Sequence, residues 1–322
     1  MINKLRDRVL KGQGITKEEA LKLIAVKSGR ILELLSAANK IKNEFMSDRV
    51  DLCSIVNAKS GSCSEDCSFC AQSAHHETEV DSYPLLKEEE ILTKAKRMDE
   101  QGAEHFGIVT SGRGIETEAE FEKILNTVQR IKAETDLEVC ASLGTLKEEQ
   151  VNKLAAVGLK RYNHNLETSK NHFAEVCSTH DYQERVQTVQ FLKKQGIEVC
   201  CGGIMGLGEG IEDRVDLAFK LKELDVDSIP LNILNPVAGT PLEGNPPLLP
   251  LEALKTTAVF RFINPTKVIK LCGGREKNLR DLQSLSLLAG VNGLLVGNYL
   301  TTTGRSIEDD LQMIDDLGLN KV

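Results

Sequence analysis

The chain has no tryptophan, and aromatic residues make up only 4% of its 322 residues. Proteins that bind single-stranded nucleic acid stack bases on aromatic side chains, and a formal net charge of −8 offers no attraction to phosphates. We therefore expect no nucleic-acid partner. No run approaches the roughly 18 consecutive apolar residues of a membrane helix, so we expect no membrane association. Residues 1–8 carry charges where a secretory signal is apolar, so we expect a cytoplasmic protein.

Cysteine is the residue type that the chain has in excess, with nine copies. A disulfide framework belongs to small secreted proteins, and nothing else in this sequence indicates secretion. Hydrophobic residues at 41% and charged residues at 27% are ordinary for a globular protein with a large core. The cysteines are therefore predicted to bind metal or to carry redox chemistry.

From residue 51 onward, short apolar segments alternate with charged amphipathic segments. Eight repeats of strand and helix are typical of a (β/α)₈ barrel of the TIM type, with a doubly wound open sheet as the alternative. Residues 1–48 are expected to form an N-terminal helical extension and residues 49–322 the barrel domain. The strands are predicted near 52–57, 105–110, 137–143, 161–166, 198–204, 228–234, 267–271 and 293–298. The helices are predicted at 87–99, 118–133, 147–156, 183–194, 212–224, 251–262, 279–289 and 306–317.

Three cysteines, Cys63, Cys67 and Cys70, follow the first predicted strand in a loop rich in glycine and serine. Thiols at this spacing can bind one metal ion or cluster only if the loop wraps around it. A four-iron cluster held by three thiolates leaves one iron open to a further ligand. A zinc site with His75 or His76 as the fourth ligand is the alternative.

The CxxxCxxC spacing, with Phe69 before the last cysteine, resembles the radical S-adenosylmethionine (SAM) superfamily. Other stretches resemble the biotin synthase family within it, from residue 54 to the end of the chain. They are GSCSEDCSFC at 61–70, YNHNLETS at 162–169, YQER at 182–185, GGIMGLGE at 202–209, PLN at 230–232 and GTPL at 239–242. The resemblance implies a radical SAM sulfurtransferase that converts dethiobiotin to biotin. It also implies that Cys63, Cys67 and Cys70 hold a 4Fe-4S cluster to which SAM binds.

The resemblance also assigns roles to polar residues near the predicted strand ends. Phe69, Asn165, Glu167 and Arg185 are expected to contact SAM, although the family usually has aspartate at the position of Glu167. Asn163, Asn165 and Asn232 are expected to bind the ureido ring of dethiobiotin, because a carboxamide offers both a donor and an acceptor. For each asparagine, a turn or capping role is the alternative.

The sequence departs from the family at the auxiliary iron–sulfur cluster that supplies the sulfur. Two of four expected ligands are replaced, by Gly107 and Lys270, while Cys140 and Cys200 remain. Cys272 lies on the same predicted strand face as Lys270, and Cys201 could turn inward through a bulge at the following glycines. We expect Cys140, Cys200, Cys201 and Cys272 to hold a rebuilt cluster, of the four-iron rather than the 2Fe-2S type, with Lys270 nearby.

The alternative for Cys201 and Cys272 is a role as small buried hydrophobes. Cys53 and Cys177 are expected to be structural.

The expected partners follow from the resemblance: an electron donor of the flavodoxin or ferredoxin type, the iron–sulfur assembly machinery and a second copy in a homodimer. A related radical SAM enzyme, similar to the hydrogenase maturase or methylornithine synthase, is the second hypothesis. An iron–sulfur or zinc binding protein without turnover is the third. Cleavage of SAM under reducing conditions separates the third hypothesis from the other two.

Overall fold

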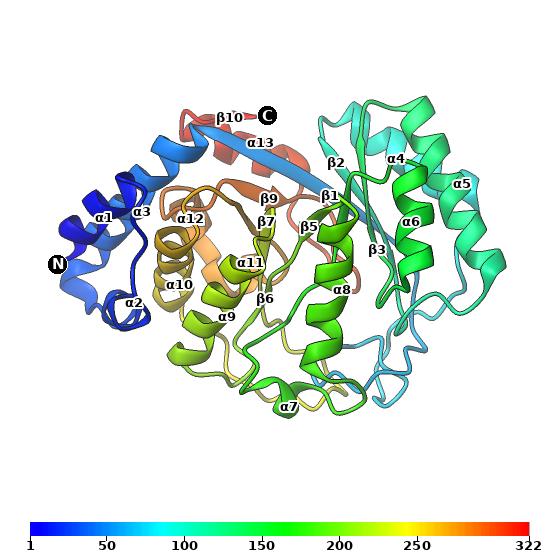
Figure 1. Ribbon diagram of the computed structural model, residues 1–322, viewed down its shortest axis with the longest axis horizontal. Helices are drawn as coiled ribbons and strands as arrows, with labels where there is room; N and C mark the ends of the chain where they lie inside the picture. The colour runs from blue at the N-terminus through cyan, green and yellow to red at the C-terminus, as the bar shows by residue number, and fades with distance from the viewer. Residues whose placement is uncertain (322) are drawn as a thin grey trace.

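A computed structural model describes residues 1–321 of the chain, apart from the side chain of residue 28. Its centre is a closed barrel of parallel strands in the order β1-β2-β3-β4-β5-β7-β8-β9, in which β9 pairs back with β1 (Figure 1). The strands are β1 (Arg49–Lys59), β2 (His105–Thr110), β3 (Glu138–Ser142), β4 (Arg161–Asn163), β5 (Glu198–Cys200), β6 (Gly203–Met205), β7 (Ser228–Ile233), β8 (Val268–Leu271) and β9 (Gly293–Leu295). The predicted (β/α)₈ barrel is confirmed, and the open sheet is excluded.

The fifth predicted strand is divided into β5 and β6, which both pair with β7. Cys200 faces Ser228 and Gly203 faces Leu231, so the offset between the two strands is the same before and after the break. The register therefore continues through residues 201–202 without an inserted residue.

Helices surround the barrel (Figure 1). They are α4 (Glu88–Glu100), α5 (Glu118–Glu134), α6 (Glu148–Ala156), α7 (Phe173–Val176), α8 (Tyr182–Lys194), α9 (Ile211–Glu223), α10 (Pro250–Ile263), α11 (Arg275–Leu279), η2 (Arg280–Leu282), α12 (Gln283–Leu287) and α13 (Ile307–Asp316). The single helix predicted at 279–289 is wrong. Arg280 has a φ of 52°, which a continuous α-helix does not allow, so the chain there forms three short pieces.

The N-terminal residues form α1 (Ile2–Leu10), α2 (Lys17–Ile24), η1 (Ser28–Arg30) and α3 (Ile31–Met46), which lie against α9 and α10 (Figure 1). Thr16 and Glu19 form a capping box at the start of α2. The last strand, β10 (Asn320–Lys321), pairs with the start of β1. Within residues 1–321, no helix combines the length and apolar character needed to cross a bilayer.

Two different environments result from the alternation of side chains along the strands. Residues that point outward, such as Phe106, Val139, Ile229 and Leu271, are fully buried against the helices. Inward-pointing residues are polar or sulfur-bearing to an unusual degree, which is where the candidate site lies.

Candidate active site

A cavity of about 420 Å³ opens at the carboxyl ends of the barrel strands and extends down into the barrel. Its rim is formed by the loops that follow β1, β2 and β9, and its walls by inward residues of the strands. Ligands of (β/α)₈ barrels bind at this end. Of the residues predicted from the sequence for SAM, for dethiobiotin and for the two clusters, all but Cys201 line this one cavity.

The loop after β1 brings Cys63, Cys67 and Cys70 to the rim of the cavity. The backbone N–H of Cys63 donates to the carbonyl of Gln72 at 2.9 Å, and the N–H of Cys70 donates to the carbonyl of Cys67 at 2.9 Å. These bonds curl the loop so that three thiols face one space. Burial raises the pKa of Cys70 to about 11, so an ion that binds there must displace a thiol proton.

The two histidines of the zinc alternative do not join the three thiols. The Nε2 atom of His75 lies 3.0 Å from the carbonyl oxygen of Ser64, and that of His76 lies 3.0 Å from the carbonyl oxygen of Cys67. Neither imidazole lines the cavity. Of the residues in the zinc alternative, only the three thiols face the cavity, and thiols suit an iron–sulfur cluster.

A fourth cysteine, Cys177, lies beside this loop, and no sequence pattern predicts it there. The sulfur atoms of Cys177 and Cys67 and a ring nitrogen of His180 all lie within 4.8 Å of one another. Residues 176–180 are bonded to the cysteine loop: Ser68 N donates to Val176 O at 2.8 Å and Ser178 N donates to Asp66 Oδ1 at 2.9 Å. Contacts across more than 100 residues of sequence hold this arrangement.

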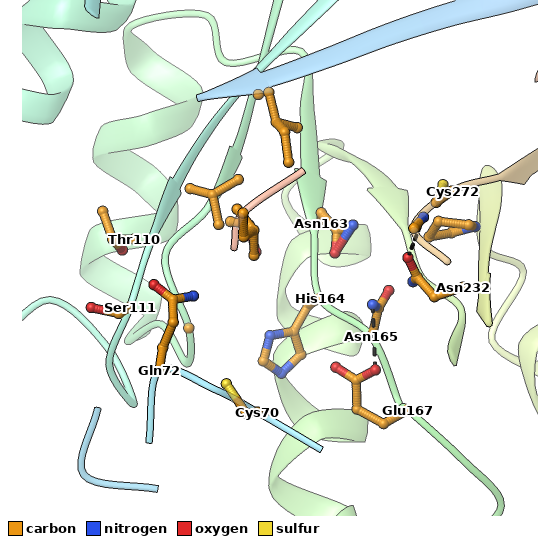
Figure 2. A pocket seen from close by; sticks show the side chains of 18 of the residues that line it. Cys70, Gln72, Thr110, Ser111, Asn163, His164, Asn165, Glu167, Asn232 and Cys272 are labelled. Atoms are coloured by element: carbon orange, nitrogen blue, oxygen red, sulfur yellow. Dashed lines mark hydrogen bonds between the residues drawn. The ribbon is translucent and has the colours of Figure 1, made fainter. Parts of the chain in front are cut away.

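The residues expected to contact SAM lie next to the three thiols. Phe69 lines the cavity and packs on the hydrophobic core. Asn165 accepts a bond from Gly202 N at 3.1 Å through Oδ1, and its Nδ2 lies 3.5 Å from Glu167 Oε2 (Figure 2). Arg185 NH1 lies 3.7 Å from Glu167 Oε1. Burial raises the pKa of Glu167, and the Arg185 guanidinium opposes that shift.

Close packing of backbone explains the glycine pair at 202–203. A Cβ atom on Gly202 would lie 1.9 Å from the carbonyl oxygen of Pro230, and one on Gly203 would lie 2.3 Å from that of Glu167. Glu167 itself has a φ of 65° and accepts a hydrogen bond from Ile204 N. The glycines therefore let the turn that carries Glu167 press against β6.

The three asparagines lie deeper and around the wall (Figure 2). Asn232 Oδ1 accepts a bond from Gly273 N at 3.0 Å, which leaves its amide nitrogen without a partner among the described residues. The side chain of Asn163 makes no hydrogen bond to any residue in 1–321. Polar groups that face a cavity without a protein partner are suited to a ligand.

His164 is a site residue to which the sequence motifs assign no role. It lines the cavity between Asn163 and Asn165 (Figure 2), is 5% exposed, and its Nε2 atom has no partner among the described residues. Burial holds the pKa of His164 well below its usual range, so its imidazole is neutral. The buried Nε2 atom without a partner, next to the two asparagines, indicates that His164 belongs to the site, and only the structure shows this.

Four cysteines line the deep part of the cavity: Cys53 on β1, Cys140 on β3, Cys200 on β5 and Cys272 directly after β8. Burial, followed by the neighbouring Cys53 thiol, raises the pKa of Cys140 well above its usual range. Burial, followed by Cys200, raises the pKa of Cys272 in the same way. The thiols of Cys53 and Cys200 thus act electrostatically on those of Cys140 and Cys272 in the same part of the cavity. Cys53 was expected to be structural, yet the structure brings it to the other three.

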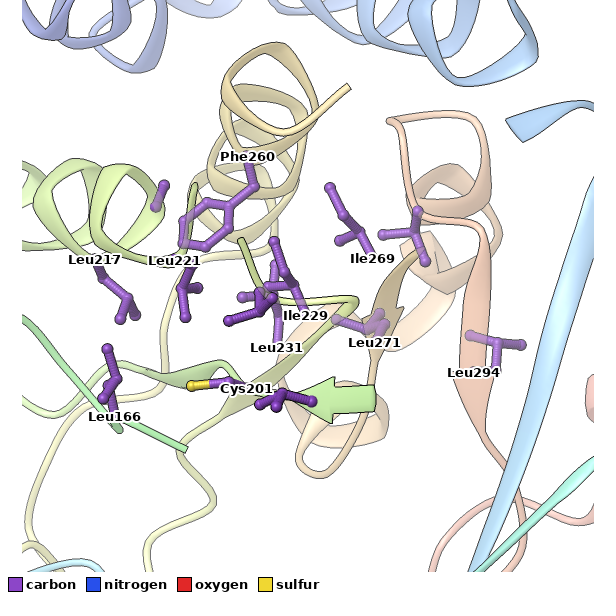
Figure 3. Close-up of a cluster of buried hydrophobic side chains, with 14 of the residues drawn as sticks. Leu166, Cys201, Leu217, Leu221, Ile229, Leu231, Phe260, Ile269, Leu271 and Leu294 are labelled. Atoms are coloured by element: carbon purple, nitrogen blue, oxygen red, sulfur yellow. The ribbon is translucent and has the colours of Figure 1, made fainter. Parts of the chain in front are cut away.

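Cys201 does not join them, and the inward bulge expected for it is absent. The unchanged register between β5 and β6 turns its side chain to the opposite face of the sheet from Cys200. The Cys201 thiol is 0% exposed among Leu166, Leu217 and Leu221 in the core between barrel and helices (Figure 3). Its environment is that of a small buried hydrophobe.

A layer of charged side chains lies below the deep thiols. Lys270 Nζ is 2.5 Å from Asp51 Oδ1, and His105 Nε2 is 3.0 Å from Asp51 Oδ2. Arg161 NH2 is 2.9 Å from Glu198 Oε2. Burial alone would raise the pKa of Asp51, but Lys270 and His105 hold it well below its usual range. Lys270 and Arg161 also line the cavity, so positive charge faces the thiols from below.

Two family models match the chain. The model of the radical SAM superfamily matches residues 59–221, and that of the biotin and thiamin synthesis associated domain matches residues 230–320. The first match runs from the end of β1 through the three-cysteine loop into α9, and the second runs from within β7 to the start of β10.

Curated relatives and solved structures agree with these matches. Biotin synthase of Carboxydothermus hydrogenoformans is 53% identical over 98% of this chain and 97% of its own length. Biotin synthase of Pelotomaculum thermopropionicum is 54% identical over 99% of both. The crystal structure of a methylornithine synthase has a TM-score of 0.85 at 24% identity, covering 99% of this chain and 97% of its own, and shares the fold. By its full-length identity to these curated relatives, the chain belongs to the biotin synthase family of the radical SAM superfamily.

Proposed function

We propose that this chain inserts sulfur into dethiobiotin to form biotin, with SAM as the source of the radical. The observation that carries the proposal is the arrangement of one cavity in three levels. Three thiols lie at its rim, unpaired amides line its wall, and four thiols lie at its floor. A substrate held at the amides has one cluster site on each side.

The rim fits an iron–sulfur cluster. Cys63, Cys67 and Cys70 offer three thiols to one space, while His75 and His76 face backbone carbonyls instead. Three protein ligands leave one position for another molecule. When bound, such a 4Fe-4S cluster supplies the electron that cleaves SAM to the 5′-deoxyadenosyl radical.

The protein's own work at the rim is to bind and orient SAM. The guanidinium of Arg185 is suited to the SAM carboxylate, because a charged donor makes a strong hydrogen bond to a carboxylate oxygen. Glu167, with its partner Asn165, is suited to the ribose hydroxyls. Phe69 lines the cavity and packs on the hydrophobic core, and its ring is suited to the adenine.

The amides on the wall are suited to a cyclic urea, which has two N–H donors and one carbonyl acceptor. Asn163 offers both an oxygen and a nitrogen, and Asn232 offers its nitrogen, since its oxygen is bonded to Gly273. Orienting the reacting carbon between the two cluster sites accounts for a large part of such catalysis. The closed barrel keeps water away from a reactive radical.

The floor fits a second cluster with a ligand set that differs from the expected one. Cys53, Cys140, Cys200 and Cys272 supply four thiols, the number of protein ligands that either a 2Fe-2S or a four-iron cluster takes, and we propose the four-iron type. Cys53 takes the place that had been expected for Cys201. When bound, this auxiliary cluster supplies the sulfur atom of the product. Lys270 is held by Asp51 and is suited to balance the negative charge of four thiolates.

The reaction needs further partners, which family membership supports. An electron donor of the flavodoxin or ferredoxin type supplies the rim cluster, and the iron–sulfur assembly machinery loads both sites. We propose that the protein works as a homodimer in the cytoplasm.

Anaerobic turnover tests the proposal. The protein is reconstituted with iron and sulfide and incubated with SAM, a low-potential reductant and dethiobiotin, and the products are quantified by mass spectrometry. Biotin formed together with 5′-deoxyadenosine supports the proposal. Deoxyadenosine without biotin, at a full complement of iron, overturns the assignment of the substrate.

A further inference from the structure

Two nitrogens of Arg185 are committed to other parts of the protein. Its Nε donates to His180 Nε2 at 2.9 Å, and its NH1 donates to the carbonyl oxygen of Asn165 at 2.8 Å. The third nitrogen, NH2, makes no hydrogen bond to a residue in the described range, and the side chain lines the cavity. Two fixed nitrogens on a planar group determine the direction of the third.

The bond to His180 also determines the tautomer of that imidazole. A guanidinium in a protein is always protonated and can only donate. His180 Nε2 must therefore accept, so the proton of the neutral ring is on Nδ1. That nitrogen faces Glu65 Oε2, to which it donates, and lies 3.3 Å from the sulfur of Cys177.

Glu65 ties this chain of bonds to the cluster loop, because it lies between Cys63 and Cys67 in the sequence. It is 6% exposed and accepts a second bond from Thr179 Oγ1 at 2.9 Å. The ring of Phe173 packs edge-on against His180, with centroids 5.5 Å apart. His180 is therefore held on three sides.

We propose that His180 is a positioning residue of the SAM site. It holds the Arg185 guanidinium with its free edge toward the cavity, and through Glu65 it links that orientation to the loop that carries the cluster cysteines. The inference rests on the proposed function only in taking Arg185 as the partner of the SAM carboxylate.

The effect is one of preorganisation. Arginine has a long side chain, and ordering it at the moment of binding costs affinity that a pre-ordered side chain does not lose. Without His180, Arg185 keeps its charge but not its direction. The loss appears in SAM affinity, whereas the cluster thiols keep their places.

Two substitutions separate the roles of the two ring nitrogens of His180. His180→Gln places an amide oxygen near the former Nε2 and keeps an acceptor for Arg185. His180→Asn places its amide near the former Nδ1, so it keeps the contact with Glu65 and loses the one with Arg185. SAM affinity is measured by equilibrium dialysis on the reconstituted protein without reductant or dethiobiotin, and iron per chain is measured on the same samples.

We expect His180→Asn to weaken SAM binding about tenfold and His180→Gln to stay within about twofold of the parent. Equal losses in the two variants overturn the proposal, as does parental affinity in both. A background of Arg185→Met gives a second test: adding His180→Asn there causes no further loss if His180 acts through Arg185, and an additive loss contradicts this.

Because dialysis reads SAM binding alone, the result is independent of whether dethiobiotin is the substrate. Absence of biotin with a positive His180 result rejects the proposed function and keeps this inference. Biotin formation with a negative His180 result keeps the proposed function and rejects this inference.

Discussion

Lys270 Nζ lies 2.5 Å from Asp51 Oδ1, and the two side chains are 2% and 9% exposed. Lys270 stands where the resemblance to the family predicts a ligand of the auxiliary cluster, and the structure pairs it with a carboxylate beneath the deep thiols. Burial opposes the charge on Lys270, but Cys53 and Asp51 raise its pKa above the usual range. Lys270 is therefore a buried cation at the floor of the cavity, with its charge facing Cys53 and Cys200.

Removal of only one partner of this ion pair should lower the stability of the fold. Lys270→Met leaves the Asp51 carboxylate without its nearest cation, and we expect a loss of about 3 to 5 kcal/mol in the free energy of unfolding. The double variant Asp51→Asn with Lys270→Met removes both charges and should lose less than Lys270→Met alone. Chemical denaturation of the parent and the variants measures this. A double variant that is less stable than Lys270→Met contradicts the pairing.

The ligand set of the floor predicts the iron content of two cysteine variants. Cys53→Ala should lower the iron from about eight per chain, the content of two four-iron clusters, to about four. Cys201→Ala is the matched control: it also removes one buried thiol, but its side chain packs in the outer core, so it should keep all the iron. The reverse pattern would restore Cys201 as a ligand and exclude Cys53.

The free amide of Asn163 predicts a selective loss of substrate binding. Asn163→Leu keeps the volume and removes both hydrogen-bonding groups, so dethiobiotin affinity should fall about tenfold or more. SAM binding without dethiobiotin should remain at the parental level, since no bond joins Asn163 to the residues assigned to SAM. A variant that weakens both ligands equally argues for a structural role of Asn163.

Lys42, on α3, predicts how stability changes with pH. It is 1% exposed, its Nζ donates to the carbonyl of Leu287 at 2.9 Å, and burial, with Arg261 nearby, lowers its pKa to about 8. In the unfolded chain a lysine has a pKa of about 10.4. Between these values the unfolded chain binds more protons, so folding stability rises with pH.

Lys42→Met has no titrating group at this position, so it serves as the reference protein. From about pH 7 to pH 9.5 the parent should gain about 2 kcal/mol relative to Lys42→Met. Unfolding midpoints of the two proteins at both pH values measure the difference. A constant gap between them would show that Lys42 titrates normally in the fold.

Much of the barrel could be predicted from the sequence because period-2 alternation is a local property of a strand. It correctly put Lys270 and Cys272 on one inward face. The same rule, followed strictly, would have turned Cys201 outward. The bulge invoked at the two glycines was wrong because those glycines make room for neighbouring backbone and leave the register unchanged.

The remaining site residues depend on contacts between distant segments. Cys53 lies inward on β1, but which inward cysteines share a level depends on the stagger of strands around a closed barrel. His180 and Cys177 meet the cluster loop through a turn more than 100 residues further along the chain, and no local pattern indicates that contact. The break at Arg280 likewise comes from a backbone conformation that helical periodicity does not reveal.

The central claim is that the sulfur of the product comes from a cluster held by the four deep cysteines. Protein reconstituted with heavy-isotope sulfide is freed of unbound sulfide and allowed one turnover with SAM, reductant and dethiobiotin, and the mass of the biotin is measured. The account predicts biotin that carries the heavy isotope in the parent, and none from Cys53→Ala despite continued formation of 5′-deoxyadenosine. Biotin without the isotope from the parent, or labelled biotin from Cys53→Ala at the parental level, would contradict it.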